Sequence, residues 1–136
     1  VTPQWDKDCT GYIEALFEAK EKGIIKAIGM SCHTLVALER AAELDWVKVA
    51  FTRINAHQIA MDGPVDQVIP VQKRFKARGA SVVGMKIFGA GKLVDQRNAC
   101  MQFAQNLGYL DAMTLGAENP EHIDENLRLM AKYPAV

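Results

Sequence analysis

The sequence predicts an α/β domain in which helices alternate with parallel strands. Four short apolar segments are separated by segments in which apolar residues recur at helical spacing. The last three apolar segments begin near residues 47, 80 and 111. This repeat of about thirty residues is normal for βα units. Because the segments are almost continuously apolar, they are typical of parallel strands buried on both faces. The prediction is therefore four parallel strands and five helices.

The chain is expected to begin with a loop and a helix. Residues 5–10 form the loop, and Asp8 or Thr10 is expected to cap the helix that follows. The helix covers residues 12–22, where apolar side chains lie on one face. Gly23 follows the last basic residue and ends it.

The middle of the chain predicts two further strand–helix units. They comprise strand 24–30, turn 31–34, helix 35–44, strand 47–54, loop 55–63 and helix 64–78. The turn carries side chains that can cap the first helix. Pro70 is expected to kink the second helix or to open its main part, because proline has no N–H to donate.

The C-terminal part predicts two more units. They comprise strand 80–88, glycine turn 89–91, helix 95–107, a weak strand at 111–115 and helix 121–132. Asn119 is expected to cap the last helix, with Pro120 at its first position.

Two architectures fit four parallel strands: a small doubly wound sheet and half of an eight-stranded barrel. The chain opens with a helix, which favours a segment cut from a longer βα series. Residues 1–136 are therefore interpreted as a partial domain. A half barrel would leave two open strand edges and would have to pair with something.

Composition excludes several classes of protein. Lys plus Arg and Asp plus Glu each number 16 of 136 residues, so there is no basic excess for nucleic acid. No apolar run is long enough to span a bilayer. Three dispersed cysteines argue against a disulfide framework and favour a reducing cytoplasm.

The most suggestive local motif is the glycine turn after the third strand. Gly89-Ala90-Gly91 would let backbone N–H groups approach an anion, and Lys86 would place a cation nearby. The stretch matches neither a Walker loop nor a Rossmann fingerprint. A plain strand-to-helix turn is the alternative interpretation.

Other polar residues near strand ends carry weaker predictions. Arg53 lies on an otherwise apolar strand face, as a cation facing a ligand or as one partner of an internal salt bridge. Cys32 beside His33 is a poor nucleophile pair, because no third group is evident. His33, His57 and Asp62 lack metal-ligand spacing, so no metal site is predicted.

Four segments, in chain order, resemble the aldo/keto reductase family. Residues 23–33 (GIIKAIGMSCH) are similar to its GKIRAIGVSNH segment, and residues 47–55 to the next strand, which ends in Asn. Residues 83–93 resemble VIAMKPLGGGKL, and residues 116–127 resemble GARNPEQLEENL. The matches cover about residues 5–130.

The resemblance implies the C-terminal half of a (β/α)8 TIM barrel that binds NADP or NAD. These segments belong to the family's last four strands, whereas its catalytic Asp, Tyr, Lys and His lie on the first four. No catalytic residue is therefore expected in this chain. The implied parent reduces a small carbonyl substrate to an alcohol, and this span alone is expected to be inactive.

The same resemblance implies which residues contact the cofactor. Ser31 and Cys32 would contact the nicotinamide carboxamide, and Met85 would lie against the ring. The backbone from Ile87 to Leu93 would hold the pyrophosphate. The loop residues of the implied set also include the cation Lys86 and Phe88, Gly89 and Gly91. Glu125 and Asn126 would contact the adenine.

The chain also departs from the family pattern. Cys32 replaces a usual Asn, Phe51 a frequent Gln, and Met85 a frequent aromatic residue. Acidic residues, including Glu118, stand where the family often places Arg or Lys for a 2′-phosphate. Because acids repel a phosphate, the preference for NADP is expected to be weakened in this chain, and use of NAD is expected. The alternative function is a non-catalytic half-barrel module that pairs with the missing half or with a second half barrel.

Overall fold

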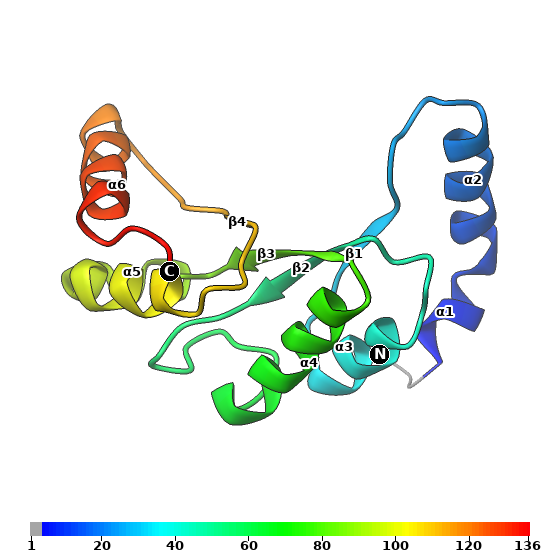
Figure 1. Cartoon of the computed structure of the whole chain (residues 1–136), viewed down its shortest axis with the longest axis horizontal. Coiled ribbons are helices and arrows are strands. Elements are labelled where there is room, and N and C mark those ends of the chain that lie inside the picture. The colour runs from blue at the N-terminus through cyan, green and yellow to red at the C-terminus, as the bar shows by residue number, and fades with distance from the viewer. Residues whose placement is uncertain (1–3) are drawn as a thin grey trace.

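The computed structural model describes residues 4–136 and is an α/β structure with one sheet (Figure 1). In this range there are six α-helices, four strands and two short 3-10 helices. The α-helices are α1 (Trp5–Asp8), α2 (Thr10–Glu21), α3 (Leu35–Ala42), α4 (Val65–Ala77), α5 (Arg97–Asn106) and α6 (Pro120–Lys132). The strands are β1 (Gly29–Ser31), β2 (Val49–Arg53), β3 (Ser81–Met85) and β4 (Ala112–Met113), and the 3-10 helices are η1 (Gly89–Gly91) and η2 (Val94–Gln96).

The four strands are parallel and follow one another in chain order, β1-β2-β3-β4. A doubly wound sheet reverses its strand order at a switch point, where the ligand binds. The described sheet has no such reversal. Its strands β1 and β4 each have one neighbour, so one edge of each is open.

The helices α3 and α4 pack together under one face of the sheet (Figure 1). Burial alternates along the two central strands: Ala50 and Thr52 of β2 and Val82 of β3 are fully buried, whereas their neighbours along each strand are only partly buried. The prediction that both faces are buried is therefore wrong for this chain. The physical reason is that, among the described residues, no helix covers the sheet face opposite α3 and α4. We call this face the open face.

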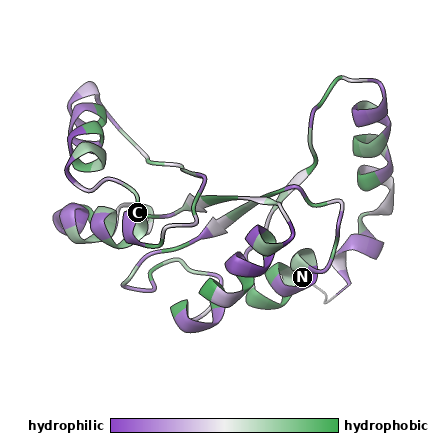
Figure 2. Cartoon of the chain, in the orientation of Figure 1, coloured by the Kyte–Doolittle hydropathy of each residue, from purple (hydrophilic) through white to green (hydrophobic). Residues whose placement is uncertain are grey.

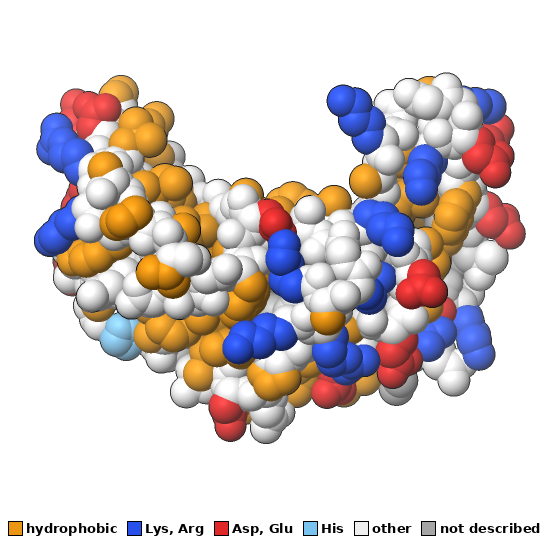
Figure 3. Space-filling view, viewed as in Figure 1, with side chains coloured by type: hydrophobic (Ala, Val, Ile, Leu, Met, Phe, Trp, Pro, Cys, Tyr) orange, Lys and Arg blue, Asp and Glu red, His pale blue; other side chains and the backbone are white. Residues whose placement is uncertain are grey.

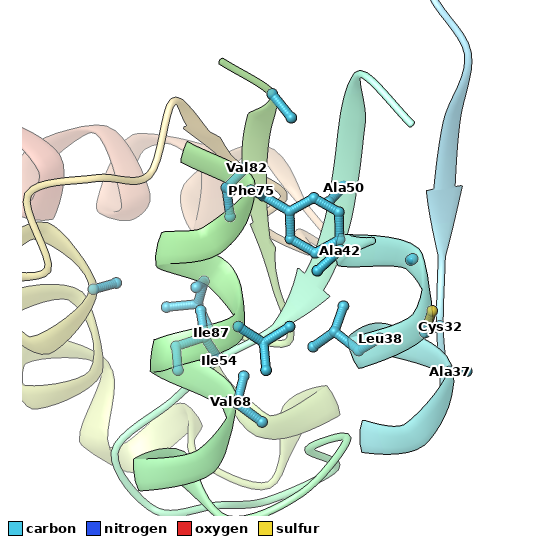
Figure 4. Close-up of a cluster of buried hydrophobic side chains, with 14 of the residues drawn as sticks. Cys32, Ala37, Leu38, Ala42, Ala50, Ile54, Val68, Phe75, Val82 and Ile87 are labelled. Atoms are coloured by element: carbon cyan, nitrogen blue, oxygen red, sulfur yellow. The ribbon is translucent and has the colours of Figure 1, made fainter. Parts of the chain in front are cut away.

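The hydrophobic core lies between this pair of helices and the sheet. Phe75 of α4 and Leu38 of α3 have no exposed surface, and Phe75 lies beside Ala50 and Val82 of the central strands (Figure 4). Burying a large apolar side chain stabilises the fold by about 1.5–3 kcal/mol. The core therefore anchors β2 and β3 against α3 and α4.

Two predictions about the first elements need correction. The entry loop contains the short helix α1, which Trp5 anchors by donating from Nε1 to the Ala37 carbonyl at 3.1 Å. The N-cap residue of α2 is Cys9 rather than Asp8 or Thr10, and the Thr10 hydroxyl donates to the carbonyl of Lys7 at 2.7 Å. The contact of Trp5 joins residues 32 positions apart, which local sequence patterns do not display.

The first strand is shorter than predicted, and proline does not open the fourth helix. Residues 24–28 lie outside β1, because its partner β2 begins only at Val49, opposite Gly29. Helix α4 continues through Pro70. The capping predictions for the other helices hold: Thr34 accepts from the Ala37 N–H, and Asn119 accepts from the His122 N–H at 2.9 Å.

The terminal helices α2 and α6 project from the two ends of the sheet, away from α3 and α4 (Figure 1). Both carry exposed apolar side chains, including Tyr12 and Leu16 on α2 and Ile123 and Leu127 on α6, in keeping with the hydrophobic stretches in Figure 2. The space-filling outline is hollowed between these ends (Figure 3). Within residues 4–136, no helix has both the length and the apolar character needed to cross a membrane.

Candidate functional site

A groove of about 790 Å³ lies at the carboxyl ends of β3 and β4. Its walls are the loop that follows β3, the loop that follows β4, and side chains from α5 and α6. The lining residues of the first wall include Met85, Lys86, Ile87, Phe88, Ala90 and Gly91. Cofactor sites in proteins have volumes of roughly 300–1,000 Å³, so the groove is large enough for a nucleotide.

The loop after β3 has an unusual backbone. Four residues, Lys86, Gly89, Ala90 and Gly91, have φ between 56° and 88°, in the left-handed region. This arrangement leaves the N–H groups of Ile87, Phe88 and Ala90 without an acceptor among the described residues. Successive free N–H groups in such a loop form a concavity suited to an anion. The loop therefore has the backbone chemistry of a phosphate site.

A buried asparagine holds this loop in place. Asn55 follows β2 and has no exposed surface. Its Nδ2 donates to the carbonyl of Lys86 at 3.0 Å and to that of Ile59 at 2.8 Å, while its Oδ1 accepts from the Ile59 N–H at 3.1 Å. The side chain ties the loop after β2 to the loop after β3. Asn55 is a positioning residue that sequence reasoning noted only as the end of a strand.

Two cations line the groove. Lys86 is exposed, and Arg97 of α5 is 8% exposed with its guanidinium 5.3 Å from the Phe88 ring centroid. Arg97 Nη1 donates to Glu125 Oε2 of α6 at 2.8 Å. Sequence analysis missed Arg97, and the one available signal was a basic residue at the start of a helix after the glycine turn. The groove therefore offers both N–H donors and positive charge.

The opposite wall carries an acidic residue and a histidine. Glu118 and His122 both line the groove, and the Glu118 N–H donates to His122 Nδ1 at 3.4 Å. A carboxylate here repels a second phosphate in the same region.

The structure separates the predicted nicotinamide residues. Met85 lines the groove, but Ser31 and Cys32 line a second pocket of about 370 Å³ beside α1. Strand β2 lies between β1 and β3 and keeps the two places apart. Burial, together with the charge on Asp62, raises the pKa of the Cys32 thiol to about 12, so this thiol is protonated at neutral pH.

The remaining predicted residues lie at the margin of the groove. Gly89 and Leu93 are buried beneath the loop, where Leu93 packs into the core. Glu125 reaches the groove through its contact with Arg97. Asn126 is 6% exposed, and its Oδ1 has no partner among the described residues. The structure thus groups residues 85–88 with Ala90 and Gly91 along the groove.

The residues weighed for metal or nucleophilic chemistry include Asp62, which acts electrostatically on both Cys32 and His33. Within the range that the structure describes, no group of three His, Cys, Asp or Glu side chains could hold a metal ion. Arg53 instead forms a salt bridge with Asp62, with 3.5 Å between Nε and Oδ1. The internal salt bridge predicted as one interpretation of Arg53 is confirmed.

Comparison of the chain with protein-family models, curated proteins and solved structures gave no match. The aldo/keto reductase resemblance therefore stays a prediction from the sequence.

Proposed function

We propose that the chain is the nucleotide-binding half of an NAD(P)H-dependent carbonyl reductase of the aldo/keto reductase type, built as half of a (β/α)8 barrel. The observation that carries the proposal is the groove after β3, where free N–H groups lie beside Lys86 and Arg97. A dinucleotide needs a cradle of this kind for its pyrophosphate.

The sheet supports the barrel part of this proposal. Strands in chain order, with α3 and α4 on one face, are the arrangement of a singly wound barrel. The groove lies at the carboxyl ends of the strands, where barrel enzymes bind their ligands. The open face corresponds to the interior of such a barrel.

In this proposal the chain's own residues bind and orient the cofactor. The loop at 86–91 holds the pyrophosphate, and Met85 contacts the nicotinamide ring. The bound cofactor supplies hydride chemistry, and the proton donor comes from the absent half. The chain alone is expected to bind nucleotide without turnover.

Nucleotide titration tests the proposal. NADH and NADPH are added to the chain and followed by nucleotide fluorescence, with Lys86→Gln as the test variant and Lys92→Gln as its control. Lys92 is exposed in the same loop but does not line the groove. We expect NADH to bind more tightly than NADPH, and Lys86→Gln to weaken NADH by about tenfold. Absence of binding by either nucleotide, or equal effects of both variants, would contradict the proposal.

A second candidate function rests on a different observation. The open sheet edges and the exposed apolar faces of α2 and α6 favour a half-barrel module that pairs with another half. Such a module would associate without binding nucleotide. Sedimentation equilibrium with and without NADH separates the two functions.

A further inference from the structure

The salt bridge between Arg53 and Asp62 leaves the Nη1 and Nη2 groups of the arginine without a hydrogen bond. Asp62 has a fully buried side chain, and its Oδ1 faces Arg53 Nε at 3.5 Å without hydrogen-bond geometry. Its Oδ2 accepts from the backbone N–H of Arg53 at 3.4 Å. Neither Arg53 Nη1 nor Nη2 donates a hydrogen bond to any of the described residues. Of the three guanidinium nitrogens of Arg53, Nε alone is buried without a hydrogen-bond partner. The two Nη groups also lack such a partner but are not buried, so they reach solvent.

The register of the sheet places these free groups on the open face. Arg53 is paired with Met85 across β2 and β3, and directly paired residues of parallel strands share a face. The neighbouring residue Thr52 points the other way, toward α4, where its hydroxyl accepts from Gln72 Nε2. Arg53 therefore lies next to the residue that lines the nucleotide groove, at the carboxyl end of the strand.

We propose that Arg53 binds the anionic group of a small organic ligand on the open face, beside Met85. A guanidinium presents two parallel N–H donors that match a carboxylate or phosphate, and the charge of Asp62 lies beside Nε, on the other side of the group. That the ligand also carries a carbonyl group rests on the proposed function. The inferred substrate class is a small carbonyl acid or a carbonyl phosphate.

Asp62 makes the proposal sharply testable. Its negative charge lies beside the guanidinium and weakens the attraction of Arg53 for any other anion. Removing the charge while keeping the shape should therefore strengthen anion binding. Replacing Arg53 by Lys keeps a positive partner for the buried carboxylate but removes the two-donor fork. A purely structural salt bridge predicts neither of these effects.

The experiment measures dissociation constants by isothermal titration calorimetry for pyruvate, dihydroxyacetone phosphate and acetone. The variants are Arg53→Lys and Asp62→Asn, and the controls are Arg128→Lys and Asp124→Asn, which change exposed residues of α6. Circular dichroism checks that each variant is folded.

We expect at least one anionic probe to bind more tightly than acetone. Arg53→Lys should weaken this anion about tenfold, Asp62→Asn should tighten it a few-fold, and the controls should leave it unchanged. A response of pyruvate alone identifies a carboxylate site, and a response of the phosphate alone identifies a phosphate site. Equal binding of acetone and both anions, or anion affinities unchanged in Arg53→Lys, overturns the proposal.

NADH affinity measured on the same proteins separates this inference from the proposed function. Neither Arg53→Lys nor Asp62→Asn should change it, because neither residue lines the nucleotide groove. If the chain fails to bind NADH while pyruvate still responds to Arg53, the anion site stands and the reductase proposal fails. If NADH binds and no anion responds to Arg53, the reverse holds.

Discussion

The two glycines that flank Ala90 provide a direct test of the loop geometry. Gly89 has φ of +58°, and a Cβ built there would lie 2.9 Å from Leu93 Cδ1 and 3.0 Å from Ile59 Cγ2. Gly91 has φ of +88°, but a Cβ there would meet nothing within 4 Å. The substitutions Gly89→Ala and Gly91→Ala therefore share backbone strain and differ in packing.

The magnitudes follow from these distances. A left-handed conformation costs an L-residue about 1–2 kcal/mol, and this cost applies to both variants. Overpacking a rigid core adds about 1–3 kcal/mol, and this cost applies to Gly89→Ala alone. We therefore expect Gly91→Ala to lower the free energy of unfolding by about 1–2 kcal/mol and Gly89→Ala by about 2–5 kcal/mol.

Urea unfolding followed by circular dichroism measures both values, and equal m-values would show that the unfolding transitions are comparable. The reasoning is refuted if the two variants are equally destabilised, because the contact of Gly89 with Leu93 would then carry no cost. It is also refuted if Gly91→Ala is neutral, because the loop would then not hold its left-handed backbone.

Three further predictions concern other parts of the molecule. Burial raises the pKa of the Asp111 carboxyl, but the contact with Lys76 and the hydrogen bond accepted from the Val82 N–H at 2.7 Å outweigh it and lower the pKa below 3.8. The stabilisation from these contacts should therefore be present at neutral pH and be lost as the pH falls below 3.8. Comparison of urea unfolding with Asp111→Asn should give a difference of about 1 kcal/mol, because solvent screens this partly exposed ion pair. Iodoacetamide at pH 8 should spare Cys32 in mass spectra, because raising its pKa from 9.0 to about 12 lowers the thiolate fraction about a thousandfold. Leu127→Glu on α6, where Leu127 is 59% exposed, should change stability by less than about 0.5 kcal/mol yet abolish any self-association seen by sedimentation.

The order of elements could be predicted from the sequence because each βα unit carries its own signals. Asn119 and Pro120 mark the start of α6 locally, and the structure confirms both. The helix α1 could not be predicted, because Trp5 is held by the Ala37 carbonyl and by the ring of Trp46, 6.1 Å away. The length of β1 depends on where β2 begins, which is also a property of the assembled sheet.

The candidate site divides in the same way. Residues 85–91 are contiguous, so a local motif could identify them as one wall of a site. The contributions of Asn55 and Arg97 depend on packing between elements, and the only local signal is the basic residue at the start of the helix after the glycine turn. Strand β2 lies between β1 and β3 and so separates Ser31 from Met85. This separation could be known only from the strand order.

The uncovered surfaces of the molecule have a common geometry that links the proposals. Helices α2 and α6 rise from the two ends of the sheet on the side opposite α3 and α4, and the outline is hollowed between them (Figures 1 and 3). One partner seated in this hollow would cover the open face and both apolar helices together.

The nucleotide groove lies at the carboxyl ends of β3 and β4, and its loop can therefore be tested in the chain alone. Arg53 lies where the open face meets that end, so a partner would enclose its anion site. Enclosure lowers the local dielectric and strengthens a charged contact. The affinity of an anion for Arg53 should therefore rise when the hollow is filled, whereas a partner that leaves the groove open should not alter NADH binding.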